Sequence, residues 1–146
     1  MKIYVASSWR NEYQQSVVQK LREANHEVYD FKTDGKPFDW KDTEFNWKGT
    51  TNDVIERFKS VLKHSLVNEA FNADIQALRR ADVCILVLPC GNSAHLEMGW
   101  AVSNNVHTII YIPSGTSLDF DPELMYKMCD HISTSIDDVI EYLRGF

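Results

Sequence analysis

Several common sequence signals are missing from this chain of 146 residues, and each absence excludes a class of protein. It contains neither a G-x-G-x-x-G nor a G-x-x-x-x-G-K-[ST] stretch, which argues against ordinary dinucleotide binding and against P-loop ATP hydrolysis. Its 3 cysteines, Cys84, Cys90 and Cys129, include no C-x-x-C pair, so neither a disulfide framework nor a zinc site is supported. We therefore expect reduced thiols, no metal, no cofactor and a cytoplasmic location.

The chain also lacks a long apolar run and a basic stripe. No 18 consecutive residues are apolar and the first residues enter a strand pattern at once, so we expect no membrane span and no export signal. The 15 Lys and Arg residues are scattered among 21 Asp and Glu residues, for a net charge of −6, which disfavours duplex nucleic acid as a partner. A small molecule is the expected partner.

The residues that are present indicate one α/β domain over 1–146. Apolar patterns predict short strands at 3–6, 26–31, 83–88, 108–112 and 129–133, and helices at 11–24, 51–63, 66–80, 93–104, 122–128 and 136–143. Strands that alternate with helices in this way predict a doubly wound, five-stranded parallel sheet. The expected fold is a flavodoxin-like or Rossmann-like three-layer α/β/α architecture.

Residues 32–51 interrupt this alternation as an irregular insertion. The segment is rich in Asp, Lys, Gly and Thr, yet it carries Phe38, Trp40, Phe45 and Trp47. Long irregular segments in compact domains are usually lids or binding loops. We interpret this one as a lid or an oligomer contact, with a protein-binding surface as the alternative.

Three loops that follow predicted strands should meet at one edge of the sheet. They span residues 7–10, 89–93 and 113–117. In open α/β sheets, ligands bind at the carboxyl ends of the strands. The sequence therefore predicts a pocket where these loops converge.

The first of these loops, Ser7-Ser8-Trp9-Arg10, carries groups that suit an anionic or aromatic ligand. It offers two hydroxyls, and the guanidinium of Arg10 can bind phosphate or carboxylate in a bidentate manner. Trp9 can stack on a base. The alternatives are a surface cation for Arg10 and ordinary packing for Trp9.

Glu97 is the candidate nucleophile. It lies four residues after Ser93, so the two share one face of the helix expected at 93–104. We expect Glu97 in the first helical turn, where the positive end of the helix dipole helps keep a carboxylate ionised. Acidic residues also occur in first turns for structural reasons alone, and that alternative stays open.

Two residues extend this candidate site. Asp74, on the helix before the central strand, can face the pocket as a second carboxylate, or it can be solvated or paired with a neighbouring cation. Tyr4, in the first strand, is either a core residue or a phenol that positions the nucleophile. His95 lies only two residues from Glu97, so we expect it to point elsewhere, at the surface or an interface.

Three stretches of the chain are distinctive together: Tyr4-Val-Ala-Ser-Ser-Trp-Arg10, then Asp74 with Leu78 and Ala81-Asp82-Val83, and Gly91-x-Ser-x-x-x-Glu97-x-Gly99-x-Ala101. They resemble the nucleoside 2-deoxyribosyltransferase superfamily, which includes the 2′-deoxynucleoside 5′-phosphate N-hydrolases. The resemblance covers residues 2–31 and 70–112. The resemblance implies a homodimer or larger homo-oligomer in which a neighbouring subunit completes the site.

The resemblance also implies a role for each residue. Glu97 would attack the anomeric carbon and displace the nucleobase, giving a covalent glycosyl-enzyme that water or a second base resolves. Asp74 would handle the nucleobase or its proton, and Tyr4 would position the nucleophile. The residues at positions where the 5′-phosphate or the sugar hydroxyls bind are Ser7, Ser8, Arg10, Gly91 and Ser93.

Two functions follow from these residues. The first is an enzyme that cleaves or transfers the N-glycosidic bond of a nucleoside or nucleoside 5′-monophosphate, and the cation Arg10 favours a phosphorylated substrate. The second is a non-catalytic nucleotide-sensing module, because one fold can serve different functions. A sensing module would bind a nucleotide and leave it intact.

Overall fold

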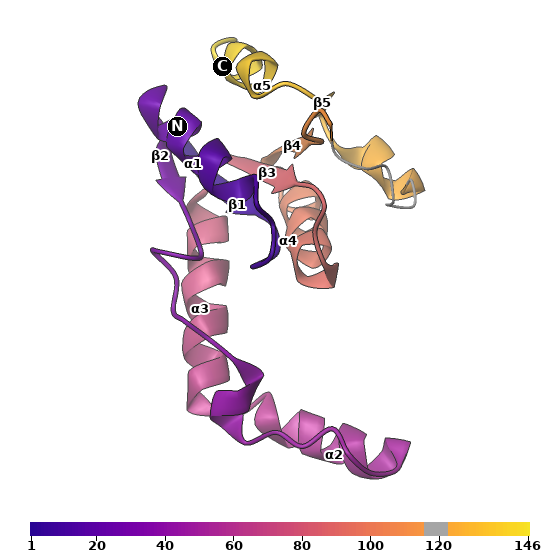
Figure 1. Cartoon of the computed structure of the whole chain (residues 1–146). Coiled ribbons are helices and arrows are strands. Elements are labelled where there is room, and N and C mark those ends of the chain that lie inside the picture. The colour runs from indigo at the N-terminus through magenta and orange to yellow at the C-terminus, as the bar shows by residue number, and fades with distance from the viewer. Residues whose placement is uncertain (116–122) are drawn as a thin grey trace. The chain divides into compact units, whose positions relative to one another are not determined.

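A computed structural model describes residues 1–115 and 123–146 and shows a five-stranded parallel sheet (Figure 1). The strands lie in the order β2-β1-β3-β4-β5. Their bounds are β1 (Lys2–Ala6), β2 (Glu27–Tyr29), β3 (Val83–Val87), β4 (His107–Tyr111) and β5 (His131–Ser133). This order is that of a doubly wound, flavodoxin-like sheet, so the predicted fold class is confirmed.

The helices follow the predicted order. They are α1 (Gln14–Glu23), α2 (Thr51–Val61), α3 (Ser65–Arg80), α4 (Asn92–Ser103) and α5 (Ile136–Leu143). The helix predicted at 122–128 is instead a short 3-10 segment, η2 (Leu124–Met128), and its expected first residue lies outside the described residues. Residues 116 and 117 of the loop predicted after β4 also lie outside them.

Contacts between residues define two compact units in the chain. The sheet unit comprises Met1–Asp30 and Ala77–Phe146, and the aromatic unit comprises Phe31–Gln76. The aromatic unit begins where the irregular insertion was predicted and continues through α2 into α3. The prediction of a single domain over 1–146 stays a prediction.

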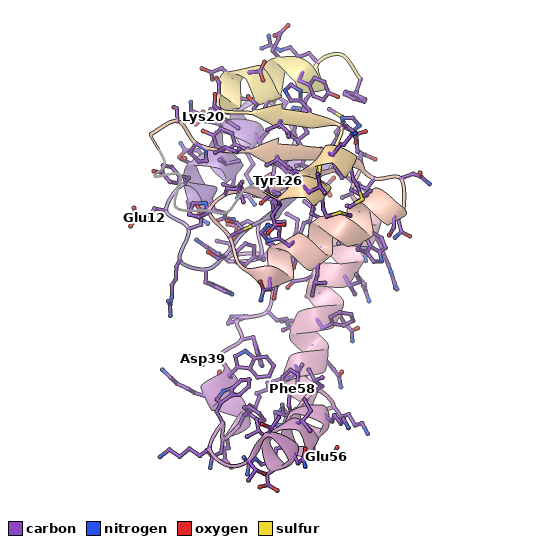
Figure 2. All side chains as sticks on the ribbon, turned by 90° about the vertical axis from the view of Figure 1, so that its right-hand side faces the viewer. Glu12, Lys20, Asp39, Glu56, Phe58 and Tyr126 are labelled. Atoms are coloured by element: carbon purple, nitrogen blue, oxygen red, sulfur yellow. The ribbon has the colours of Figure 1, made fainter. Side chains whose placement is uncertain are left out.

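The aromatic unit gathers rings around Phe58 of α2, which Figure 2 labels. The Phe58 ring centroid lies 5.8 Å from that of Trp40 and 6.0 Å from that of Trp47, and Phe45 meets Trp47 edge-on at 4.4 Å. Trp40 begins a 3-10 turn, η1 (Trp40–Thr43), so the segment predicted as irregular contains local structure. Aromatic packing organises it, a long-range effect that periodicity does not reveal.

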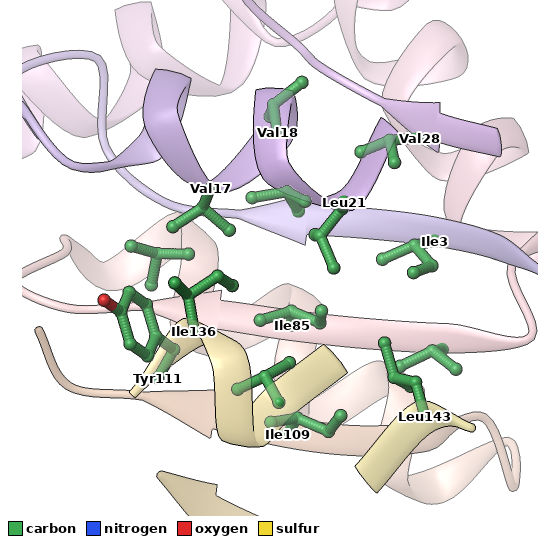
Figure 3. Close-up of a cluster of buried hydrophobic side chains, with 14 residues drawn as sticks. Ile3, Val17, Val18, Leu21, Val28, Ile85, Ile109, Tyr111, Ile136 and Leu143 are labelled. Atoms are coloured by element: carbon green, nitrogen blue, oxygen red, sulfur yellow. The ribbon is translucent and has the colours of Figure 1, made fainter. Parts of the chain in front are cut away.

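The sheet unit has its main core between the sheet and one pair of helices (Figure 3). Because side chains alternate along a strand, every second residue faces this core. The buried side chains include Ile3, Val5, Ile85 and Ile109 from the strands, Val17 and Leu21 from α1, and Val139 and Leu143 from α5. Helix α4 packs on strands β1, β3 and β4, with Ala94, Met98 and Ala101 buried. The face of the sheet opposite the main core therefore carries Tyr4, Cys84 and Leu86.

Candidate functional site

The loops after β1 and β3 meet at the carboxyl edge of the sheet, as the sequence predicts. The Ser7 hydroxyl donates to the carbonyl oxygen of Val87 at 2.9 Å. Asn11 Nδ2 donates to the carbonyl oxygens of Val87 at 3.2 Å and Pro89 at 2.9 Å. These bonds join the first loop directly to the segment that leads into α4.

Asn11 also organises the start of α1. Its Oδ1 accepts hydrogen bonds from the backbone N–H groups of Tyr13 at 2.8 Å and Gln14 at 3.0 Å. These amides would otherwise lack an acceptor before the helix begins. The helix predicted at 11–24 includes Asn11, and this was wrong because α1 begins only at Gln14 and the Asn11 side chain binds the backbone at the helix start.

Glu97 lies in the second turn of α4, not in the first. The helix begins at Asn92, and its first turn contains no acidic residue. The dipole argument for Glu97 was therefore wrong, because the effect falls off within the first turn. The prediction that Ser93 and Glu97 share one face is confirmed, since α4 includes both residues.

Glu97 lies on α4, which packs against β1, β3 and β4 on the sheet face that carries Tyr4. Burial raises the pKa of Cys84 well above its usual value, and the negative charge of Glu97 raises it further. Cys84 pairs with Tyr4 across β3 and β1, so their side chains project from the same face. Tyr4 is buried, and its ring stacks on Tyr29 with the centroids 5.4 Å apart.

The remaining predicted substrate-binding residues line the two joined loops. Ser8 is half-buried and its carbonyl oxygen accepts from the backbone N–H of Asn11, whereas Trp9 and Arg10 are exposed. Gly91 is the residue before α4, and a Cβ atom added there would meet no atom of the described ranges 1–115 and 123–146 within 4 Å. These ranges thus leave open space at Gly91.

Asp74 belongs to the aromatic unit. It is half-buried on α3, whereas Tyr4 and Glu97 lie in the sheet unit. Its predicted partnership with Glu97 stays a prediction.

Sequence reasoning missed a buried polar cluster at the end of β2. Asp30 and Gln14 are fully buried, and Gln14 Nε2 donates to Asp30 Oδ1 at 2.7 Å. Gln15 Nε2 donates to Asp30 Oδ2 at 2.9 Å. Asp30 lies inside the strand predicted at 26–31, and an acidic residue within a strand pattern does not distinguish a buried carboxylate from a solvated one.

The sequence also gives no sign of the contacts that His95 makes. His95 is half-buried and contacts Gly91, Cys90 and Tyr126. It borders a cavity of about 320 Å³ between α4 and η2, whose walls include Met98, Val102, Met125 and Met128. His95 and Glu97 are about 200° apart around the helix, so the expectation that they point in different directions is confirmed.

Among residues 1–115 and 123–146, no group of three or more His, Cys, Asp or Glu side chains is arranged to hold a metal ion. Within the same residues, no helix is long and apolar enough to cross a membrane.

Comparisons with known proteins show which solved structures share this fold. No protein-family model matches the chain, and no curated protein matches it either. A 2-deoxyribosyltransferase from Bacillus psychrosaccharolyticus superposes with a TM-score of 0.62 at 21% identity, over 97% of this chain and 92% of that one. The chain has the 2-deoxyribosyltransferase fold.

Two other solved structures agree. A conserved protein from Enterococcus faecalis V583 gives a TM-score of 0.64 at 14% identity, over 99% of this chain and 98% of that one. A CMP N-glycosidase from Clostridium botulinum gives 0.51 at 14% identity, with 99% of both chains covered. The fold implied by the sequence resemblance is confirmed, and at these identities the likeness concerns the fold alone.

Proposed function

We propose that this protein cleaves or transfers the N-glycosidic bond of a nucleoside or nucleoside 5′-monophosphate, with Glu97 as the nucleophile. The observation that carries the proposal is the position of Glu97. Glu97 lies on α4, which packs on the sheet face that carries Tyr4 and Cys84, and its negative charge adds to the rise in the pKa of the Cys84 thiol. The 2-deoxyribosyltransferase and the CMP N-glycosidase with this fold support the reaction class.

The proposed reaction has two steps. A Glu97 oxygen forms a bond to the anomeric carbon as the bond from that carbon to the base nitrogen breaks, and the electron pair leaves with the base. Asp74 supplies or guides the proton that the departing base takes up. Water or a second base then attacks the anomeric carbon and releases Glu97, as in a retaining glycosidase.

The loop residues bind the rest of the substrate. Arg10 and the open backbone at Gly91 receive the 5′-phosphate or sugar hydroxyls, together with Ser7, Ser8 and Ser93. Ser7 already donates its hydroxyl proton to Val87, so toward a substrate it acts as an acceptor. Trp9 is 54% exposed and available to stack on the base.

We propose that the active form is a cytoplasmic homo-oligomer. The resemblance implies that a neighbouring subunit completes the site. Several large apolar side chains on α4 and η2 are exposed, among them Leu96 and Leu124, and they offer a surface for a second copy. Apolar side chains grouped at a surface are common at protein interfaces.

The test is base release. The purified protein is incubated with a panel of nucleosides and their 5′-monophosphates, with and without a free acceptor base, and products are separated by chromatography. Glu97→Gln should abolish base release and exchange while ligand binding persists. Glu27→Gln is the matched control, because Glu27 is exposed at the amino end of β2, away from the strand-end loops.

A second readout addresses the nucleophile. Acid-quenched wild-type protein should carry a glycosyl adduct on the peptide that contains Glu97, detectable by mass spectrometry. Binding without base release across the whole panel would reject the enzyme and favour the nucleotide-sensing module. Base release that survives in Glu97→Gln would reject Glu97 as the nucleophile.

A further inference from the structure

A chain of side-chain contacts links η2 to the loop between β3 and α4. The hydroxyl of Tyr126, labelled in Figure 2, lies 2.8 Å from His95 Nε2. Their rings are nearly parallel, with an angle of 8° between the planes. On its other side, His95 Nδ1 lies 2.9 Å from the carbonyl oxygen of Gly91 and 3.6 Å from Cys90 Sγ. One imidazole therefore contacts both the loop and η2.

The hydrogen-bonding roles in this chain follow from its chemistry. A carbonyl oxygen can only accept, so Nδ1 of the neutral imidazole carries the proton and Nε2 accepts from the Tyr126 hydroxyl. Burial, with smaller effects from Cys90 and Glu123, raises the pKa of Tyr126 to about 12. Burial and the charge of Glu97 raise the pKa of Cys90 to about 12. Both groups stay protonated at neutral pH, so Tyr126 keeps the hydroxyl proton that it donates to His95.

The loop between β3 and α4 is also held by residues that follow β1. Asn11 binds the carbonyl oxygen of Pro89, and Ser7 binds that of Val87. The segment from Val87 to Gly91 is thus fixed at both ends by side chains from elsewhere in the sheet unit. Precise binding sites need this kind of support around the residues that touch the ligand.

His95 is on the side of α4 away from Glu97, and it borders the cavity between α4 and η2. It is therefore badly placed to act on a substrate held at Glu97. Because His95 contacts Cys90 and Gly91, it can affect the site by holding this loop in place.

We infer that His95 and Tyr126 are positioning residues, which together hold residues 90–93 in the geometry that binds the substrate. This inference rests on the proposed function, because Gly91 and Ser93 are its substrate-binding residues. The hydrogen bond from Tyr126 to His95 transmits the position of η2 to the loop. Its loss should weaken substrate binding more than it slows the chemical step.

The test compares two tyrosines that make the same kind of contact. Tyr126→Phe removes only the hydroxyl that binds His95. Tyr142→Phe is the matched control, because the Tyr142 hydroxyl lies 3.1 Å from Nε2 of His107, the first residue of β4, at the amino edge of the sheet. Tyr126→Phe should raise KM roughly threefold to tenfold and change kcat less than twofold, as expected for loss of one neutral hydrogen bond. Tyr142→Phe should leave both constants unchanged.

A double-mutant cycle identifies His95 as the link. His95→Asn keeps an amide near the position of Nδ1 and removes Nε2, so it should reproduce the KM change of Tyr126→Phe. The double variant should show no more than the single change. Additive effects in the double variant, or an equal KM change in Tyr142→Phe, would overturn the inference.

Hydrogen exchange of residues 90–96 provides a readout that does not require activity. These residues are identical in the wild type, Tyr126→Phe and Tyr142→Phe, so their exchange rates compare directly. Exchange should be several-fold faster in Tyr126→Phe alone. Unchanged exchange in that variant would overturn the positioning role. Faster exchange in a protein that releases no base from any substrate would support the positioning role and reject only the proposed reaction.

Discussion

Asp130 shows how single side chains connect the strands of the sheet unit. Its Oδ2 accepts hydrogen bonds from the backbone N–H and the hydroxyl of Thr108, each at 2.8 Å, and lies 3.3 Å from His107 Nδ1. Burial alone would raise the pKa of Asp130, but the two bonds from Thr108 and the charge of His107 outweigh it and lower the pKa. The carboxylate thereby joins the start of β4 to the residue before β5.

The lowered pKa of Asp130 predicts a pH dependence of stability. A carboxyl group with a depressed pKa stabilises the fold above its unfolded value, near 3.8, and this contribution is lost as the pH falls through the folded value. Asp130→Asn should lower Tm by about 3 °C at pH 7, and the difference from the wild type should shrink below about pH 4. Thermal unfolding followed by circular dichroism from pH 3 to pH 7 measures both.

The neighbouring Asp138 provides the control for this pH series. It is exposed on α5 and accepts from His131 at 2.9 Å. A hydrogen bond from Ser133 and one from His131 lower its pKa. Both carboxylates are exposed, but Asp130 binds the backbone and hydroxyl of the buried Thr108, whereas the two bonds of Asp138 come from side chains, so Asp138→Asn should change Tm less than Asp130→Asn does. A Tm difference for Asp130→Asn that stays constant down to pH 3 would contradict the assigned role.

At the scale of elements, the sequence predicted the sheet unit well, because burial patterns define strands and amphipathic helices. The run Val83–Val87 is buried throughout, which is the signature of a central parallel strand, and α5 matches its predicted range of 136–143. The prediction that the loops after β1 and β3 meet followed from the general rule for strand ends. The hydrogen bonds from Asn11 to Val87 and Pro89 join residues that are separated by 76 and 78 positions in the chain. No local sequence pattern encodes such pairs.

The site was predicted less completely for the same reason. Glu97 and Ser93 share a face as their spacing requires, but Glu97 is the sixth residue of α4. It would be the fifth residue even of the helix predicted at 93–104, so either start leaves it beyond a first turn of about 3.6 residues. The link from Tyr126 to His95 spans 31 positions, so the sequence predicts only that His95 lies at the surface or an interface.

The aromatic unit, Phe31–Gln76, has few buried side chains. In Phe31–Gln76, all of which the structure describes, Val61 is the single hydrophobic residue that is fully buried. Contacts among Trp40, Phe45, Trp47 and Phe58 therefore supply much of the organisation of this segment. Aromatic pairs of this kind contribute about 0.5–1.5 kcal/mol each beyond their buried area.

Phe58→Ala should therefore loosen the aromatic unit. Removal of the ring that contacts both tryptophans should reduce the near-ultraviolet circular dichroism of Trp40 and Trp47 and speed proteolysis within residues 38–48. Phe71→Ala is the matched control, since Phe71 lies in the same unit but is 61% exposed. Equal effects from the two variants would show that Phe58 is not the centre of the cluster.

At the scale of the whole molecule, α4 presents an apolar surface that residues 1–115 and 123–146 leave exposed. Leu96 is 76% exposed, and Gly99, three residues later on the same side of the helix, has no atom of these residues within 4 Å of an added Cβ. A glycine inside a helix costs about 1 kcal/mol relative to alanine. A second copy packed closely against α4 would give both residues a structural role.

Leu96→Glu tests this interpretation of α4. Wild-type protein at about 10 µM should sediment as a dimer or larger assembly, and Leu96→Glu should sediment as a monomer, because a buried, unpaired carboxylate strongly opposes association. Leu62→Glu is the matched control, since Leu62 is 44% exposed in the aromatic unit, and it should keep the wild-type mass. A monomeric wild type would reject the proposed homo-oligomer. An oligomeric wild type whose mass survives Leu96→Glu would instead place the interface away from this side of α4, and the neighbouring subunit would have to reach the strand-end loops by another face.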